Sequence, residues 1–180
     1  LFNWYRYKMG VKYDLPNFKP VIVFRSKFED DKKEENVGAD YEFFRNIIDN
    51  LKPSDFDFLK NIDIDKSRKI YEKGQSRILD IREFIQEENI PFQSIITYLQ
   101  DAFKDRNCIL THSQEKSASG RRGEDKTTPE QDELLNSLED KNNKITAVFT
   151  CKRSTEGWDV LNLFNIVRMY KGRDETVSKS

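Results

Sequence analysis

Four short apolar runs recur along the chain, and they alternate with longer stretches whose apolar residues follow helical spacing. Each run is rich in β-branched or aromatic residues, which is typical of strands buried on both faces of a parallel sheet. Strands of this kind are predicted over 21–24, 107–111, 145–150 and 165–170. Because strands that alternate with helices form parallel sheets covered by those helices, the pattern predicts an α/β fold.

Helical spacing dominates between the first strand and the second. Apolar residues from Tyr41 to Leu51 repeat every three or four positions, and this predicted helix ends before a proline. More than 80 residues separate the two strands, which is more than one crossover helix needs. We therefore interpret residues 53–103 as a helical insertion packed on the sheet domain. Its helices are predicted from Ser54, over 78–85 and after Pro91.

Three polar stretches lack such a period. Residues 1–18 mix aromatic and basic side chains, and we interpret them as a linker or docking arm. Residues 113–128 offer little to bury and are predicted to form a mobile loop. Residues 175–180 are interpreted as a truncated tail, and since the chain opens without Met we expect it to be a piece of a longer protein.

A further helix has a clear start signal. Thr128 stands at the cap position, a proline follows at the first helical position, and Gln131 lies three residues on. This is the pattern of a capping box, in which each side chain bonds the other residue's backbone N–H. The helix is predicted to pack through Leu134, Leu135 and Leu138.

Composition excludes several classes of protein. Hydrophobic residues make up 36% and charged residues 35% of the chain, but 13 Phe, 7 Tyr and 2 Trp suffice for a core, so disorder throughout is disfavoured. The longest aliphatic run is far shorter than the roughly 20 residues of a membrane span, and no signal peptide is visible. Cys108, Cys151 and His112 are too few for a disulfide framework or a zinc site. We therefore expect a cytoplasmic protein without a metal centre.

The net charge of −1 conceals an uneven distribution. Residues 1–27 carry six Lys or Arg against Asp14 alone, and residues 151–180 carry six against four acids. The middle of the chain is correspondingly acidic, which excludes a uniform coating of nucleic acid. A local basic face built from both ends remains open, and so does an ordinary solvated surface.

Candidate chemistry lies beyond the carboxyl ends of the predicted strands, where open α/β sheets bind their ligands. The segments there are Arg25–Lys27, His112–Ser113 and Cys151–Asp159. The third is the richest, because its Lys, Arg and hydroxyl side chains can contact phosphate and its glycine permits close backbone approach. Alternatively, that glycine serves a tight turn, Trp158 fills the core and Asp159 caps the next turn. The residues alone leave both interpretations open.

A longer string ties this segment to a known family. Thr-Glu-Gly-Trp-Asp-Val-Leu-Asn-Leu-Phe-Asn-Ile-Val-Arg at 155–168 resembles motif V of superfamily 2 helicases of the DEAD/DEAH type. More narrowly, it resembles the restriction (Res) subunit of type III restriction-modification enzymes. Residues 19–27 are similar to the family's motif IV strand, and 109–113 to the strand end between the motifs. Their order is that of a second RecA-like motor domain, and the resemblance covers residues 19–174.

The resemblance implies a function for the parent protein. It implies an ATP-dependent helicase or translocase of the P-loop NTPase type that acts on double-stranded DNA in a restriction endonuclease. ATP and Mg²⁺ would bind mainly to an absent first lobe, and further partners would be that lobe and a DNA methyltransferase (modification) subunit. The residues carried over are Glu156, Gly157 and Asp159 for the ATP cleft, and Arg25, Ser26, Lys27, Cys151, Lys152, Arg153, Ser154 and Thr155 for the DNA backbone.

Departures from the family pattern limit this chain. Cys151 stands where many relatives have Thr, which puts a hydroxyl contact to phosphate there in doubt. The sequence contains neither a Gly-x-x-x-x-Gly-Lys-Ser/Thr phosphate loop nor a Gly-Arg-x-x-Arg motif, so we expect no catalytic residues and no ATPase activity in this chain alone. Two alternatives stay open. One is a different superfamily 2 helicase or remodeller, and the other is a noncatalytic domain whose helical insertion binds a protein partner of a restriction complex.

Overall fold

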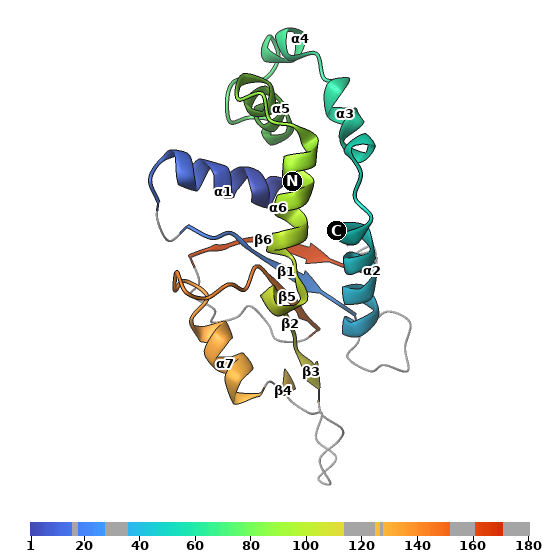
Figure 1. Cartoon of the computed structure of the whole chain (residues 1–180), viewed down its shortest axis with the longest axis vertical. Coiled ribbons are helices and arrows are strands. Elements are labelled where there is room, and N and C mark those ends of the chain that lie inside the picture. The colour runs from blue at the N-terminus through green and yellow to red at the C-terminus, as the bar shows by residue number, and fades with distance from the viewer. Residues whose placement is uncertain (16–17, 28–35, 114–124, 127, 152–160, 171–180) are drawn as a thin grey trace, which may run out of the picture.

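A four-stranded parallel sheet forms the centre of the molecule (Figure 1). The computed structural model describes all residues except 16–17, 28–35, 114–124, 127, 152–160 and 171–180. In the order in which they pair, the strands are β2 (Cys108–Leu110), β5 (Ala147–Thr150), β1 (Val21–Arg25) and β6 (Leu163–Arg168). The α/β fold with a parallel sheet flanked by helices, as in a RecA-like lobe, is confirmed.

The apolar runs of the sequence occupy the middle of this sheet. Every residue of β5 is buried, and β1 is buried except at Ile22 and Arg25. Each of the four predicted strands is present, although the last begins and ends two residues earlier than predicted. The last residue pair between β6 and β1 is Arg168 with Arg25, and β6 ends there.

One face of the sheet is covered by α2 (Val37–Asp49) and α6 (Phe92–Ala102). Phe24 and Phe149 from neighbouring strands stack there with their ring centroids 4.5 Å apart, and Phe44 of α2 packs on both. Aromatic rings bury large apolar areas, so this contact anchors the helices to the sheet. We call this the α2-side face.

The opposite face is covered by α7 (Pro129–Asn136). We call it the α7-side face, and its smaller core joins the helix, its following turn and three strands. The helix starts as predicted, because the Gln131 N–H donates to Thr128 Oγ1 at 3.2 Å and the Thr128 N–H donates to Gln131 Oε1 at 3.1 Å. The core residues are Val21, Val23, Ile109, Leu135, Leu138, Ile145 and Val148.

The segment 1–18 is not an irregular linker. Residues Phe2–Lys12 form helix α1, and Trp4 on it is only 1% exposed. The Trp4 ring lies 6.0 Å from that of Phe84, and the Asn3 side-chain amide donates to the carbonyl of Pro20 at 3.2 Å. The helix was missed because its aromatic and basic residues show almost no amphipathic period, whereas its stability comes from these tertiary contacts.

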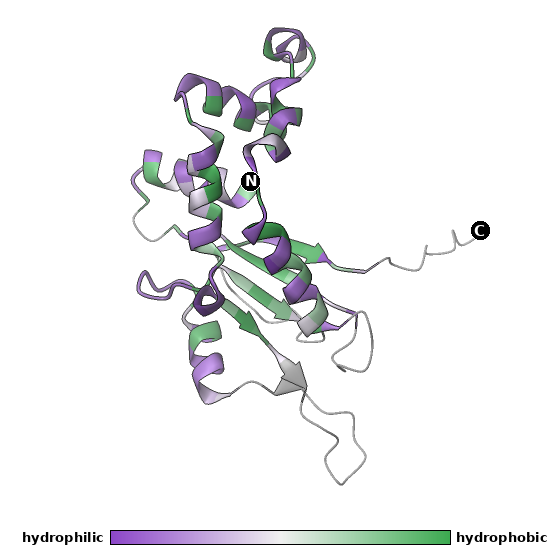
Figure 2. Ribbon diagram, turned by 45° about the vertical axis from the view of Figure 1, so that its right-hand side comes forward, coloured by the Kyte–Doolittle hydropathy of each residue, from purple (hydrophilic) through white to green (hydrophobic). Residues whose placement is uncertain are grey.

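Residues 53–103 are helical, as predicted, and we call them the helical unit. The first helix begins at Pro53 rather than Ser54, because the Lys52 N–H donates to Asp55 Oδ2 at 2.8 Å. Helices α3, α4 and α5 of the unit lie at the end of the molecule away from α7, whereas α6 reaches down to the sheet (Figure 1). Figure 2 shows hydrophilic residues along much of the unit, while the central strands are hydrophobic. Its elements are η1 (Pro53–Phe56), α3 (Asp57–Lys60), α4 (Ile64–Arg68), α5 (Arg77–Glu87) and α6.

The segment 113–128, predicted to be a mobile loop, contains a short pair of strands. His112–Ser113 (β3) pairs antiparallel with Asp125–Lys126 (β4), since backbone groups of a polar segment can bond each other without burying side chains. Residues 114–124 and 127 of this segment lie outside the described residues.

A single turn of 3-10 helix, η2 (Asp105–Asn107), precedes β2. Within the described part of the chain, no helix is both long and apolar enough to cross a membrane.

Candidate functional site

The carboxyl ends of all four parallel strands meet along one edge of the sheet, which we call the carboxyl edge. Arg25 at the end of β1 is paired with Thr150 of β5 on one side and with Arg168 of β6 on the other. Ser26 and Cys151 follow directly, and Thr111 follows β2. Ligands of parallel α/β sheets bind at this edge, so these residues form the candidate site.

Side chains at the carboxyl edge divide between the two faces of the sheet. Paired residues of a parallel ladder project to the same face, and the face alternates along each strand. Val23 and Val148 belong to the α7-side core, so Arg25 and Thr150, two residues later, project to that face. Cys151 packs in the α2-side core, and the same alternation puts Ser26, the residue after Arg25, on that side of the sheet.

On the α2-side face, backbone and thiol contacts join the ends of β1 and β5. The Ser26 N–H donates to the carbonyl of Thr150 at 2.8 Å, and Cys151 Sγ lies 3.2 Å from the carbonyl of Lys27. Cys151 is 7% exposed and Ser26 is 1% exposed. The Cys151 thiol therefore makes a structural contact between the ends of the two strands. The Ser26 hydroxyl has no hydrogen-bond partner among the described residues.

The α7-side face of the edge carries positive charge. Arg25 and Arg168 are both exposed, and their strands are held in register by the Met169 N–H, which donates to the carbonyl of Arg25 at 3.0 Å. The Arg168 guanidinium lies 5.6 Å from the centroid of the Tyr170 ring, a cation–π distance. Lys27 is exposed a few residues away. Exposed cations at strand ends can contact phosphate oxygens.

Buried hydroxyls lie beside these cations. Thr111 is fully buried, and its hydroxyl lies 3.3 Å from the carbonyl of Phe149. Thr150 is 2% exposed, and its hydroxyl has no partner within the described part of the chain. A buried polar group without a partner is uncommon in proteins and needs an explanation, such as a bound ligand or water.

The structure brings together four of the residues expected to contact DNA: Arg25, Ser26, Lys27 and Cys151 lie along the carboxyl edge. Residues 152–155 of that set, and the expected ATP-cleft residues Glu156, Gly157 and Asp159, lie outside the described residues. Sequence reasoning did not assign Thr150 or Arg168 to the site. The signal that identifies them is their pairing with Arg25, and this register is known only once the strands are aligned.

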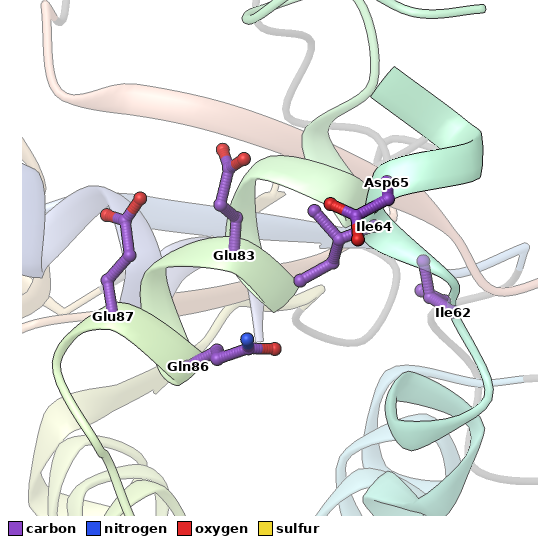
Figure 3. Close-up of a pocket in the computed structure, with 6 residues that line it drawn as sticks. All are labelled: Ile62, Ile64, Asp65, Glu83, Gln86 and Glu87. Atoms are coloured by element: carbon purple, nitrogen blue, oxygen red, sulfur yellow. The ribbon is translucent and has the colours of Figure 1, made fainter. Parts of the chain in front are cut away.

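A separate pocket of about 470 Å³ lies in the helical unit (Figure 3). Figure 3 shows the carboxylates of Glu83 and Glu87 on α5, with Asp65 of α4 nearby. Arg68 bonds Asp80 at 2.6 Å and Glu83 at 2.7 Å, and its hydrogen bond holds the pKa of Glu83 below its usual value. This acidic lining repels phosphate, so the pocket is not suited to contact DNA. The lining residues are Ile62, Ile64, Asp65, Glu83, Gln86 and Glu87.

Metal ligands do not gather in the described residues: no group of three or more His, Cys, Asp or Glu side chains there could hold an ion. Cys108, one of the two cysteines of the chain, lies at the start of β2. Burial raises its pKa to about 12, so it is a protonated core residue.

Comparison with known proteins identifies one relative over nearly the whole chain. The sequence is 39% identical over 176 residues to the probable type III restriction-modification enzyme HindVIP Res subunit of Haemophilus influenzae. The match covers 97% of this chain and 32% of that protein, so the chain spans about a third of the relative's length. The resemblance to type III Res subunits is thereby confirmed. No family model and no solved structure matches the chain.

Proposed function

We propose that this chain is the second RecA-like motor lobe of a type III restriction enzyme Res subunit. In the full enzyme it would couple ATP hydrolysis to translocation along double-stranded DNA and to cleavage. The observation that carries the proposal is the 39% identity to a Res subunit along 97% of the chain. The parallel sheet supports it, because a motor lobe of this kind needs strand ends that converge on one edge.

The charge pattern of the carboxyl edge supports duplex DNA as the substrate. Arg25, Lys27 and Arg168 are exposed there, whereas the helical unit carries ten acidic against seven basic side chains. Contacts to phosphates by Arg and Lys supply much of the affinity of proteins for DNA. DNA is therefore expected at the carboxyl edge rather than on the helical unit.

ATP would be shared between two lobes. In this proposal Glu156, Gly157 and Asp159 face the nucleotide from the segment after β5, while the first lobe supplies the phosphate loop and the Mg²⁺ ligands. This chain would couple the presence or hydrolysis of the nucleotide to the DNA contacts at the carboxyl edge. The chain alone is accordingly expected to be inactive.

A second candidate function is favoured by the helical unit. Phe58, Ile70 and Tyr71 are exposed on this unit, which also contains the acidic pocket. Exposed apolar side chains beside charged ones are typical of protein interfaces. In this alternative the chain is a noncatalytic interaction domain, and its partner is the modification subunit of the restriction complex.

ATP turnover separates the two functions. Turnover is measured with and without duplex DNA for this chain and for the protein extended through both flanking regions. The motor proposal expects DNA-stimulated turnover only in the extended protein, and at least a tenfold loss, about 1.4 kcal/mol in the barrier, in its Asp159→Ala variant. Asp57→Ala, an exposed carboxylate of the helical unit, is the matched control and should turn over normally. If the extended protein hydrolyses no ATP, the motor proposal fails and the interaction domain takes its place.

A further inference from the structure

Four residues from three strands and the end of a fourth stand in one row across the carboxyl edge. The row is Thr111, Thr150, Arg25 and Arg168, and we call it the Thr–Arg row. Arg25 is paired with both Thr150 and Arg168, and Thr111 follows Leu110, whose partner is Phe149. Because paired residues project to one face, the whole row lies on the α7-side face.

Two like charges adjoin in this row. Arg25 and Arg168 are paired residues of neighbouring parallel strands, whose backbones lie about 4.8 Å apart in any sheet. Like charges in such positions repel and destabilise the sheet unless an anion lies between them. Among the described residues, neither guanidinium forms an ion pair with a carboxylate. Within the described part of the chain, the pair therefore has the charge of an anion site and no carboxylate bound to it.

The Thr150 hydroxyl adds an independent observation. It belongs to a side chain that is 2% exposed, it has no partner among the described residues, and it is next to Arg25 in the row. The neighbouring Thr111 hydroxyl is already used by the carbonyl of Phe149. A buried hydroxyl without a hydrogen-bond partner destabilises the folded chain, because its contact with water is not replaced. An acceptor oxygen of a ligand at the strand end would remove this cost.

The Arg end of the row is open to a ligand. Ile166 of β6 is paired with Val23 and projects to the α7-side face, yet it is 57% exposed. The core under α7 thus covers β2, β5 and the start of β1 but leaves the end of β6 uncovered. Arg25 and Arg168 border this uncovered region.

We propose that Thr150 and Arg168 act together with Arg25 as a phosphate-binding group for the backbone of duplex DNA. The two guanidiniums bind the phosphate oxygens as charged donors, and the Thr150 hydroxyl donates from the adjacent strand. The Tyr170 ring lies within cation–π distance of the Arg168 guanidinium. This inference rests on the proposed function, because it names further residues that contact the same DNA.

Binding of a short fluorescent DNA duplex to the 180-residue chain tests the proposal. Arg168→Gln and Arg25→Gln are each expected to weaken binding about tenfold and to reduce the slope of log K against log salt by about one, as for one lost phosphate contact. Arg77→Gln is the matched control, because Arg77 is an exposed arginine at the start of α5, far along the chain from the row. It should bind like the unmodified chain.

Thr150→Val separates binding from a structural role. It removes only a hydroxyl that has no partner among the described residues, so the midpoint of urea unfolding should stay the same or rise. Affinity for the duplex should nevertheless fall about fivefold, the value of one hydrogen bond. A merely structural Thr150 would leave affinity unchanged.

The outcomes are distinct for the two proposals. If the unmodified chain binds the duplex and Arg168→Gln and Thr150→Val bind as Arg77→Gln does, the Thr–Arg row is overturned while DNA binding stands. If the chain does not bind the duplex even at low salt, the proposal that the Thr–Arg row binds phosphate is also wrong. The motor proposal is then decided separately by ATP turnover of the extended protein.

Discussion

At the scale of single residues, the alternation of side chains gives the carboxyl edge two different chemistries. Ser26 and Cys151 project to the aromatic core and join the strand ends, whereas Arg25 and Thr150 project to the α7-side face. Neighbours in the sequence therefore serve different purposes. Among the described residues, those on the α7-side face combine exposed charge with a buried hydroxyl, that of Thr150, that has no hydrogen-bond partner.

Burial also determines the reactivity of Cys108. The burial that raises its pKa to about 12 leaves almost no thiolate at pH 8, whereas in the unfolded chain the pKa is about 8.5. A raised thiol pKa adds stability that is fully present below the unfolded pKa and is lost as pH rises toward the folded one. We expect iodoacetamide to label Cys108 at least about 100-fold more slowly in the folded chain than in urea at pH 8, measured by peptide mass spectrometry. Equal rates in the two states would contradict the burial of this thiol.

At the scale of elements, the sequence predicted what local pattern controls. The strands were found from their apolar runs, and the start of α7 from Thr128 and Gln131, because these signals lie within a few residues of one another. Helix α1 was not found, since its contacts reach Phe84 and Pro20, which are distant in sequence. For the same reason Arg25 was identified as a site residue but Arg168, known only from strand pairing, was not.

Trp4 is expected to be the main anchor of α1. It is 1% exposed and packs against Phe84, so Trp4→Ala should lower the free energy of unfolding by about 3–5 kcal/mol, as for other buried aromatic residues. Tyr13→Ala, at a site that is 69% exposed just after the helix, should change it by less than about 0.5 kcal/mol. Urea unfolding followed by circular dichroism measures both. Similar losses in the two variants would mean that α1 is not anchored through Trp4.

Gly10 in the same helix is expected to resist substitution. A Cβ at this position would lie 2.5 Å from Cδ1 and 3.0 Å from Cβ of Phe18. Alanine normally stabilises a helix by about 1 kcal/mol relative to glycine, but overpacking costs about 1–3 kcal/mol. Gly10→Ala should therefore lower the midpoint of urea unfolding, and the double variant with Phe18→Ala should lose less than the sum of the two single losses. An increase in the midpoint of Gly10→Ala would show that Phe18 does not restrict this site.

At the scale of the whole molecule, charge and core are organised differently. The charges separate, because the cationic residues of the carboxyl edge are distant in the fold from the acidic pocket of the helical unit. The core does not separate in this way. A single cluster joins Trp4 of α1, Phe56 and Phe84 of the helical unit, and Phe149 of the sheet. Periodicity was enough to predict that residues 53–103 are helical. It could not predict that these helices share one core with α1 and the sheet, because that core depends on contacts between distant segments.

This shared core predicts that the helical unit and the sheet unfold together. In a Trp158→Phe background Trp4 is the only tryptophan, and its fluorescence reports on the core, while circular dichroism at 222 nm reports on all helices. The two unfolding midpoints should coincide, as expected of a single cooperative transition. Phe84→Ala should shift both midpoints together, with a loss of about 3–5 kcal/mol, because Phe84 packs in the helical unit on a side chain of α1. Phe58→Ala, at a site of the same unit that is 51% exposed, is the control and should shift neither midpoint.

If Phe84→Ala moved only the dichroism transition, the helical unit would be a separately folding body, and it could then bind a partner without changing the carboxyl edge. A common shift would instead mean that any partner bound to the helical unit acts on the same folded body that carries Arg25 and Arg168.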